Sequence, residues 1–245
     1  MTSSDFPPEL EGLAPTDDEP ARVSASGVPY PLWSWRTAQL EPGSPSAAAA
    51  GLIEEWVVKE RPPVLGVVLH GGAGLGKTGM ACAAVRAAAA RRVGSNAAWI
   101  SVTAPRVVEA VRVGDFRRRP APAQFYRWRD LKALLDAAKM GRLPWEEAPP
   151  LTADKILTEI EERCAVLALD DVDVDVLTPW KEEVLLRLLE LPLRGCRLIL
   201  TGNADPAASA GLARLGERVC DRLLDSAVFA RFFLTGESLR RRRPA

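Results

Sequence analysis

The segment that most constrains the fold of this chain is a glycine-rich run that ends in Lys77-Thr78. From Gly71 it follows the pattern G-x-x-x-x-G-K-T, shortly after the apolar run 64–69. Glycines allow backbone conformations that a Cβ would block, so successive N–H groups can converge on a phosphate. We predict a phosphate-binding loop (P-loop) for ATP, in which Lys77 neutralises the β- and γ-phosphates and the Thr78 hydroxyl ligates Mg²⁺. The predicted nucleotide-binding residues are Gly71, Gly72, Ala73, Gly74, Leu75, Gly76, Lys77 and Thr78. The alternative is a glycine turn followed by a surface lysine.

Strands and helices are expected to alternate after residue 63. Short apolar runs predict strands that are buried on both faces, and periodic or alanine-rich stretches predict the helices between them. The expected strands are 64–69, 97–102, 165–169 and 197–201, and the expected helices are 77–92, most of 103–163, and 180–191. This alternation predicts an α/β fold with a parallel sheet flanked by helices.

Two acidic residues follow the apolar run 166–169, which is the layout of a Walker B strand. Asp170 is expected to hold Mg²⁺, through water, and Asp171 to orient or polarise the attacking water. The alternative is a strand end with solvated acids. Asp173 and Asp175 continue the acidic run, and we interpret them as loop charges.

The expected strand 197–201 also ends in polar residues, Gly202 and Asn203. Beside a Walker B strand, such a strand can place an amide near the γ-phosphate, so Asn203 is a candidate for positioning the hydrolytic water. A Gly-Asn pair is also an ordinary turn sequence, and this alternative stays open.

Composition excludes several classes of site. The single histidine, His70, leaves no basis for a His-based catalytic or metal cluster, and we interpret it as a strand-end residue. The four cysteines form no C-x-x-C pair, which gives no support to a zinc ribbon or redox motif. No apolar run is long enough to cross a bilayer, and no signal peptide is evident, so we expect a soluble cytoplasmic protein.

The first 45 residues differ from the rest of the chain. They are rich in Pro, Ser, Asp and Glu, which predicts a largely disordered arm that docks a partner. An aromatic cluster at Tyr30, Trp33 and Trp35 is either a docking peptide or a patch that packs on the following domain. Residues 46–245 are expected to form the ATPase domain, starting with a helix over 46–59 that Ser46 caps.

Together these motifs resemble AAA+ ATPases of the DnaC/IstB type, the bacterial or phage helicase loaders and transposition helpers. The resemblance runs from about Val64 to Arg240. It rests on the motifs 71–78, 167–172, 178–185, 200–203, 216–223 and 236–240. One departure is that Gly202 replaces the serine of the usual Thr-Ser-Asn in the family.

The resemblance also implies roles for three arginines. Arg222 matches the arginine finger, which reaches the γ-phosphate of a neighbouring subunit, and Arg218 is the alternative finger. Arg240 matches the sensor-II arginine, which contacts phosphate in its own subunit. A guanidinium suits such roles because its charge is permanent and its donors are forked. The alternative is that these are solvated arginines.

The interval 106–132 combines bases with aromatic residues. In the initiator branch of the family, a helical insertion at this place faces nucleic acid. Arginines that track phosphates and aromatics that stack on bases would suit single-stranded DNA. The alternative is a solvated helix face with its aromatics in the core. The residues are Arg106, Arg112, Arg117, Arg118, Arg119, Arg127, Arg129, Lys132, Phe116, Phe125, Tyr126 and Trp128.

The expected function is that of an ATP-dependent helicase loader in DNA replication, which engages a replicative helicase and single-stranded DNA. It would form a homo-oligomer through its AAA+ faces. A transposition helper that regulates a transposase is the first alternative. A P-loop kinase for a small molecule and a nucleotide-gated adaptor are the others.

Overall fold

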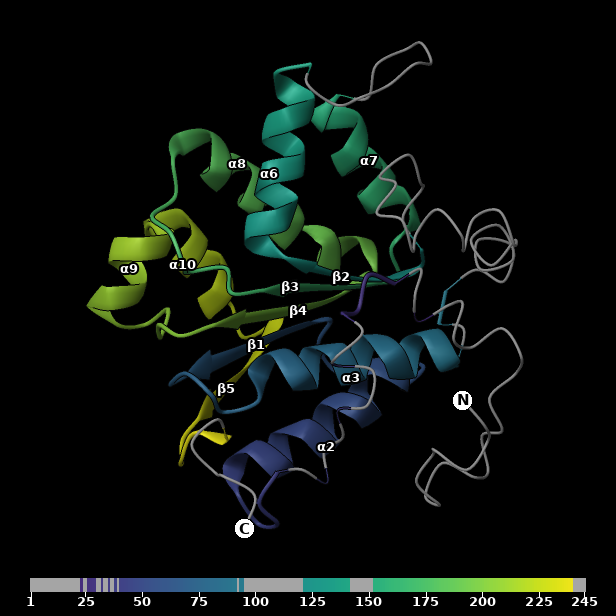
Figure 1. Ribbon diagram of the computed structural model, residues 1–245, viewed down its shortest axis with the longest axis vertical. Coiled ribbons are helices and arrows are strands. Elements are labelled where there is room, and N and C mark those ends of the chain that lie inside the picture. Colours follow the sequence, from purple (N-terminus) through teal and green to yellow (C-terminus); the bar gives the residue numbers. More distant parts are fainter. Residues whose placement is uncertain are drawn as a thin grey trace.

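A five-stranded parallel sheet forms the centre of the molecule (Figure 1). The computed structural model describes residues 23, 26–29, 32, 35, 38, 40–91, 93–94, 121–141 and 152–239. The strands are β1 (Gly66–Gly71), β2 (Ala123–Arg127), β3 (Val166–Asp170), β4 (Arg197–Gly202) and β5 (Phe229–Leu234). Their order in the sheet is β2-β3-β4-β1-β5, and every neighbouring pair is parallel. The predicted α/β class with a parallel sheet flanked by helices is therefore confirmed.

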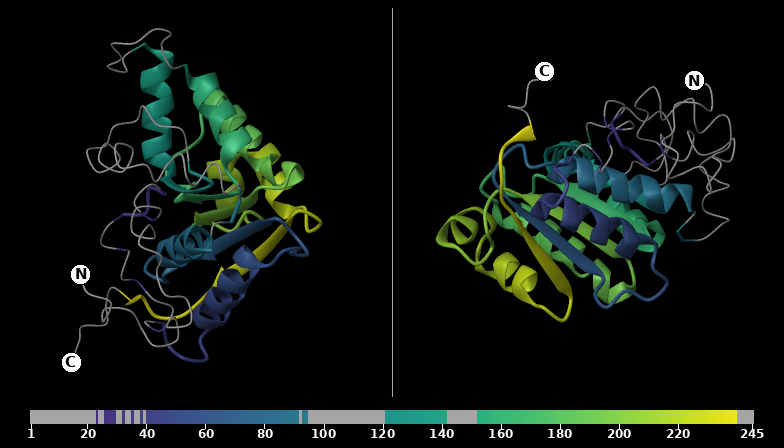
Figure 2. Two further views of the ribbon diagram at one scale, coloured as in Figure 1. Left: turned by 90° about the vertical axis from the view of Figure 1, so that its right-hand side faces the viewer. Right: turned by 90° about the horizontal axis from the view of Figure 1, so that it is seen from below.

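Helices cover both faces of the sheet, as Figure 2 shows. On one face lie α2 (Pro45–Val58) and α3 (Lys77–Ala90), and on the other lie α6 (Trp128–Lys139), α7 (Ala153–Arg163), α8 (Pro179–Leu189) and α10 (Glu217–Leu224). Successive strand residues serve opposite faces: Val67 packs in the cluster with α2 and α3, and Val68 in the cluster with α6 to α10. Strands buried on both faces account for the uninterrupted apolar runs of the sequence.

The second strand of the described chain, β2, lies within 103–163, which was predicted to be mostly helical. The expected strand 97–102 lies outside the described residues and stays a prediction. The register of β2 pairs Ala123 with Val166 and Arg127 with Asp170. The run is short and lies among prolines and arginines, so periodicity gave no signal for it. The remainder of the described part of 103–163 is helical, in α6 and α7.

Two further details correct the sequence-based picture. The sheet gains a fifth strand, β5, whose alternating burial is that of a sheet edge and which was not predicted. Helix α2 begins at Pro45, and its N-cap is Ser44, whose hydroxyl accepts the N–H of Ala47 at 3.1 Å. Ser46 is not the cap, because proline suits the first helical position and fixes the start one residue earlier.

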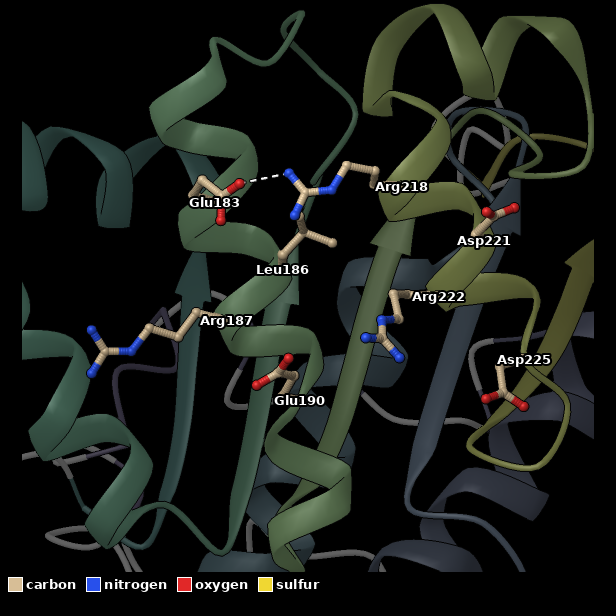
Figure 3. Close-up of a pocket in the computed structure, with 8 residues that line it drawn as sticks. All are labelled: Glu183, Leu186, Arg187, Glu190, Arg218, Asp221, Arg222 and Asp225. Atoms are coloured by element: carbon tan, nitrogen blue, oxygen red, sulfur yellow. Dashed lines mark hydrogen bonds and ion pairs between the residues drawn. The ribbon is translucent and has the colours of Figure 1, made fainter.

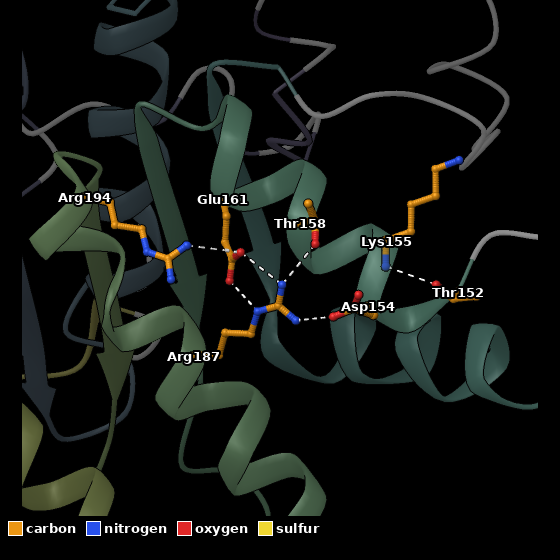
Figure 4. Close-up of polar contacts among 7 residues, drawn as sticks. All are labelled: Thr152, Asp154, Lys155, Thr158, Glu161, Arg187 and Arg194. Atoms are coloured by element: carbon orange, nitrogen blue, oxygen red, sulfur yellow. Dashed lines mark hydrogen bonds and ion pairs between the residues drawn. The ribbon is translucent and has the colours of Figure 1, made fainter.

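Helices α7 and α8 are joined by one arginine (Figure 4). The Arg187 guanidinium donates to both carboxylate oxygens of Glu161, to Asp154 at 2.5 Å and to the Thr158 hydroxyl at 3.1 Å. Arg194, on the 3₁₀ helix Leu191–Arg194, adds a contact to Glu161 at 3.3 Å. A forked guanidinium that satisfies several acceptors at once fixes the angle between the two helices.

Parts of the N-terminal segment pack onto the domain. Val23, Val28 and Leu40 belong to the same apolar cluster as α2 and α3, and Trp35 packs against it. The main chain also takes part, since the carbonyl of Ser26 accepts the N–H of Phe125 at 2.8 Å. For Trp35, packing is thus the alternative that the structure favours. Tyr30 and Trp33 lie outside the described residues. Across the described part of the chain, no helix combines the length and the apolarity needed to span a membrane.

Candidate nucleotide site

The predicted P-loop joins the end of β1 to the start of α3, at the carboxyl edge of the sheet. Gly76 caps α3 with a left-handed backbone (φ 84°), which an L side chain rarely adopts. Gly71 (φ 137°) lies so close to β5 that a Cβ would be 2.2 Å from the carbonyl oxygen of Leu234. Glycine is therefore required at both positions. Helix α3 begins directly after the loop, so the positive end of its dipole favours an anion there.

Lys77 is buried at the start of α3, and its ammonium lies inside the loop. It donates to the carbonyl oxygens of Gly71 at 2.8 Å and Gly72 at 2.7 Å, and to Asn203 Oδ1 at 3.1 Å. A buried ammonium inside a loop of this kind is a strong site for an anion. This geometry excludes the alternative of a surface lysine.

Asp170 and Thr78 meet beside the loop, as the sequence predicted. The Thr78 hydroxyl donates to Asp170 Oδ2 at 3.1 Å, and the Thr201 hydroxyl donates to Oδ1 at 2.6 Å. Burial raises the pKa of Asp170, while the hydrogen bonds from Thr201 and Thr78 oppose that rise. Asp170 is therefore a buried carboxylate with hydroxyls around it and not a solvated strand end.

These two side chains offer the donors that Mg²⁺ prefers. A hydroxyl and a carboxylate oxygen suit this ion, which usually keeps several waters and takes its remaining ligands from phosphates. Among the described residues, no group of three or more His, Cys, Asp or Glu could hold a metal on its own. The donor set thus fits an ion that the protein shares with a nucleotide.

Asp171 has the only left-handed backbone among the described non-glycine residues (φ 58°). Its N–H donates to the Thr201 hydroxyl at 2.9 Å, so the same threonine holds both acids at the end of β3. Non-glycine residues in this region are strained and concentrate at functional sites. The turn directs the chain away from the sheet immediately after Asp170 and leaves the Asp171 side chain half-exposed.

Asn203 lies where the sequence predicted it, at the end of β4 beside β3, and its side chain reaches Lys77. The residue that holds it was not predicted. Asp173 is almost fully buried (1% exposed), and its Oδ2 accepts the N–H groups of Asn203, at 2.7 Å, and of Ala204. The interpretation of Asp173 as a loop charge was therefore wrong.

Asp175 was also interpreted as a loop charge, and it does lie exposed in the loop. It has a partner, however: Lys132 Nζ donates to Asp175 Oδ2 at 2.6 Å. The pair links α6 to the loop after β3. No sequence signal identified it, because the two residues are far apart in the chain.

The C-terminal segment passes over the P-loop. The N–H of Leu239 donates to the carbonyl of Gly74 at 2.8 Å. A Cβ on Gly74 would lie 2.0 Å from Ser238 Oγ, so the approach is close. Arg240, the predicted sensor-II arginine, lies outside the described residues, and its role stays a prediction.

The two candidate finger arginines lie on α10, beside a hollow of about 600 Å³ between α8 and α10 (Figure 3). We call it the charged hollow. Arg218 is bound to Glu183 at 2.6 Å. Arg222 points into the hollow and has no hydrogen-bond or ion-pair partner among the described residues. The lining residues are Glu183, Leu186, Arg187, Glu190, Arg218, Asp221, Arg222 and Asp225.

Most of the predicted DNA-facing residues in the described part of 106–132 do not lie on an exposed face, although Arg129 does. Phe125 and Trp128 are buried in the two cores, so they cannot stack on bases. Lys132 is buried and paired with Asp175, and Arg127 is half-buried opposite Asp170. For these aromatics the alternative, that they pack in the core, is correct. Arg106, Arg112, Phe116, Arg117, Arg118 and Arg119 lie outside the described residues.

His70 is the last β1 residue before the P-loop, in line with the strand-end interpretation. Its ring packs on Phe233 at 5.3 Å, and its Nδ1 lies 3.9 Å from Asp205 Oδ1 without a hydrogen bond. Burial lowers the pKa of His70. A neutral imidazole here is a packing residue and not part of the polar site.

Known proteins resemble this chain in structure but not detectably in sequence. No family model and no curated protein matches the sequence. Solved structures do match. The DnaC helicase loader is 19% identical with a TM-score of 0.54, over 84% of this chain and 100% of that chain. DnaI is 16% identical with a TM-score of 0.57, over 89% and 100%. AMPPCP-bound DnaA from Aquifex aeolicus is 15% identical with a TM-score of 0.53, over 81% and 50%.

At these identities the likeness is one of fold. It covers most of this chain and the whole of the matched DnaC and DnaI chains. The chain therefore shares the fold of the solved DnaC helicase loader and DnaI structures, which confirms the predicted resemblance at the level of fold.

Proposed function

We propose that the chain binds and hydrolyses ATP with Mg²⁺ and acts as a helicase loader in DNA replication. One observation carries the ATPase part: Lys77, Thr78, Asp170 and Asn203 come from three segments and form one hydrogen-bonded site at the end of the sheet. The fold likeness to DnaC and DnaI supports the loader part.

Each residue has a defined role in this proposal. Phosphate oxygens replace the carbonyl oxygens and the Asn203 amide as partners of Lys77, and the P-loop N–H groups hold the remaining phosphate oxygens. Thr78 and Asp170 would hold Mg²⁺, which neutralises charge on the phosphates when it is bound. Asp171 accepts a proton from, or orients, the attacking water, and Asn203 fixes the position of that water.

Arg222 completes the site from a second subunit. It is exposed and unpaired among the described residues, and the lining of the charged hollow beside it includes no P-loop residue. A finger that works in trans needs these properties, because it must be free to meet a phosphate of the neighbour. Arg218 is the weaker candidate, since Glu183 already neutralises it. We therefore propose a homo-oligomer with Arg222 at the subunit interface.

The partners are proposed to be a replicative helicase and single-stranded DNA. The residues for DNA are sought among the arginines at 106–119, because the described residues of 121–132 are largely committed to the fold. Residues 1–45 are proposed as the docking arm for the helicase. Val28, Trp35 and Leu40 pack on the domain, so a truncation that tests docking should remove only residues 1–22.

ATP turnover and a pull-down with a replicative helicase test the proposal together. We expect turnover that Asp171→Asn suppresses without loss of ATP binding, and capture of the helicase by the full chain but not by the chain lacking residues 1–22. Absence of wild-type turnover, with and without single-stranded DNA, would favour a nucleotide-gated adaptor. Phosphate transfer to a small molecule would favour a kinase. Capture of a transposase in place of the helicase would overturn the loader assignment.

A further inference from the structure

The carboxylate of Asp173 has an unusual environment. A buried carboxylate is expected to pair with a cation or to accept several hydrogen bonds. Asp173 is 1% exposed, and Arg214 Nη1 donates to its main-chain carbonyl at 2.9 Å rather than to its carboxylate. Two main-chain N–H groups donate to the carboxylate, both to Oδ2, whereas Oδ1 is buried without a partner among the described residues. The two main-chain N–H groups are therefore the contacts that account for a buried carboxylate at this position.

What it binds is the turn that carries Asn203. Oδ2 accepts the N–H groups of Asn203 and Ala204, so the carboxylate fixes the backbone on both sides of the Asn203 Cα. The side chain of the same asparagine contacts Lys77 Nζ at 3.1 Å. A fixed backbone restricts the directions in which the Asn203 side chain can extend, and in the structure it extends to the P-loop lysine.

The Asp173 carboxylate lies directly against Gly202, in the space that a side chain at 202 would need. A Cβ at Gly202 would lie 3.1 Å from Asp173 Cγ and 3.2 Å and 3.3 Å from its two oxygens. That spacing is tighter than ordinary van der Waals contact, so a Cβ at 202 would push the carboxylate back by a few tenths of an ångström. The glycine at 202 and the carboxylate at 173 therefore depend on each other: the small residue leaves the space that the carboxylate occupies.

We propose that Asp173 is the positioning residue of Asn203, and that Gly202 is required because it leaves room for the Asp173 carboxylate. This inference rests on the proposed ATPase function, in which Asn203 positions the attacking water. Asp173 does not touch the reacting atoms and acts only through the backbone of 202–204. Its loss should lower turnover and leave nucleotide affinity nearly unchanged, because Lys77 and the P-loop stay in place.

The test uses the full chain in four variants. Asp173→Ala should lower kcat by about 10- to 100-fold, the penalty expected when a catalytic group is misplaced by about 1 Å, while the Kd for a fluorescent ATP analogue changes less than about threefold. Asp173→Asn keeps an oxygen acceptor and should retain much more of the activity. Gly202→Ala displaces the carboxylate without removing it and should lower kcat as well. Asp175→Asn, in the same loop, keeps an oxygen acceptor for the buried Lys132 and is the matched control, which should hydrolyse ATP as wild type.

A double variant makes the test stricter. A serine at 202 can accept the N–H of the residue two positions on, as in an ST turn, and Asp173→Ala makes room for it. Asp173→Ala/Gly202→Ser should therefore recover part of the kcat that Asp173→Ala loses, whereas Gly202→Ser alone should be impaired by the close contact. A double variant with no higher kcat than Asp173→Ala would count against this dependence between residues 173 and 202.

Hydrogen exchange keeps the proposal testable without turnover. The amides of Asn203 and Ala204 should exchange faster in Asp173→Ala than in wild type, with the rest of the sheet unchanged. If wild type does not hydrolyse ATP, the proposed function fails, and this exchange still decides the positioning. Wild-type kcat and unchanged exchange in Asp173→Ala would overturn the inference. Equal losses of kcat, ATP affinity and melting temperature, with exchange raised throughout the domain, would also overturn it and leave a purely structural role.

Discussion

The two halves of the proposed ATPase site differ in how completely one chain builds them. Around Lys77 the polar groups are buried and bonded to one another: the ammonium to three oxygens, Asp170 to two hydroxyls, and Asp173 to two amides. Around Arg222 the side chains are mostly exposed, and the charged hollow holds acids and bases with space between them. The half around Lys77 is preorganised within one chain. The half around Arg222 has no bound partner among the described residues of the same chain.

This difference has a physical basis. Preorganised dipoles and charges stabilise a transition state because they need not rearrange when charge develops. An arginine that waits for a neighbour must stay solvated until the subunits meet, and an ion pair at such a surface is worth little. Hydrolysis should therefore depend on assembly, whereas ATP binding should not.

The largest effect is expected from Lys77→Ala. The variant removes the one buried ammonium of the loop, so we expect ATP affinity to fall by about 100-fold or more, since charge-assisted hydrogen bonds to phosphate are among the strongest in proteins. Equilibrium binding of a fluorescent ATP analogue measures this. Lys155→Ala, an exposed lysine on α7, is the control and should bind as wild type. Unchanged affinity in Lys77→Ala would refute the site assignment.

The second effect concerns the other half of the site. Arg222→Ala should bind ATP normally and hydrolyse it about 100-fold more slowly or worse, because the missing charge acts in the transition state. Arg218→Ala is the matched control from the same helix, and it should keep most of the activity, since Glu183 already occupies Arg218. The opposite ranking of the two variants would make Arg218 the finger.

Mixing two inactive variants tests whether Arg222 acts in trans. An Arg222→Ala subunit carries an intact Asp171, and an Asp171→Asn subunit carries an intact Arg222. Some mixed interfaces therefore contain one complete site, and turnover should partly return on mixing. Wild-type activity per subunit should also rise with protein concentration. A flat concentration dependence together with an inactive mixture would exclude a finger in trans.

Sequence patterns located the preorganised half well. The P-loop, Asp170 and Asn203 follow from local rules, because a motif next to a buried strand fixes its own place at the sheet edge. Asp173 and the pair Lys132–Asp175 could not be found in this way. Their partners lie 30 and 43 residues away, and only the folded chain brings them together.

The errors have a similar origin. β2 is a short run in a basic stretch, and its aromatics were open to assignment to DNA or to the core. Pairing with β3 decides the matter, since it buries Phe125 and places Arg127 opposite Asp170. Pairing between distant segments is a property of the whole sheet and not of a local window.

The third effect is a change in stability at Asp170. Burial raises the pKa of this carboxyl above its ordinary value, so the folded protein binds more protons than the unfolded chain between the two pKa values. Stability therefore falls as pH rises through that window, and the buried charge destabilises the protein at neutral pH. Asp170→Asn removes the charge and can keep the contacts to Thr201 and Thr78.

At pH 7 without nucleotide, we expect Asp170→Asn to melt a few degrees above wild type, and the difference should shrink below the ordinary pKa of aspartate, about 3.9. ATP with Mg²⁺ should reverse the order, because only wild type gains the full stabilisation from binding. Melting curves at several pH values, with and without Mg²⁺ and ATP, measure both. A less stable variant at neutral pH would show that the hydrogen bonds outweigh the cost of the buried charge.

The smallest effect is expected where the N-terminal segment supports the preorganised half. The Trp35 ring lies against the start of α3, so close that a Cβ on Gly79 would be 2.3 Å from it, and the Trp35 carbonyl accepts from Arg86 at 3.0 Å. Trp35→Ala should lower the free energy of unfolding by about 1–2 kcal/mol, because the ring is only half-buried, and the melting temperature by about 3–6 °C. Since the lost contact lies on the helix that begins with Lys77, ATP affinity should also weaken by about two- to fivefold.

Trp180→Ala is the matched control: it removes a half-buried tryptophan from α8, on the other face of the sheet, where the ring contacts Lys139. It should lower the melting temperature by a similar amount and leave ATP affinity unchanged. If Trp35→Ala instead melts as wild type and binds ATP as wild type, residues 1–45 act only as a docking arm, as the sequence alone predicted.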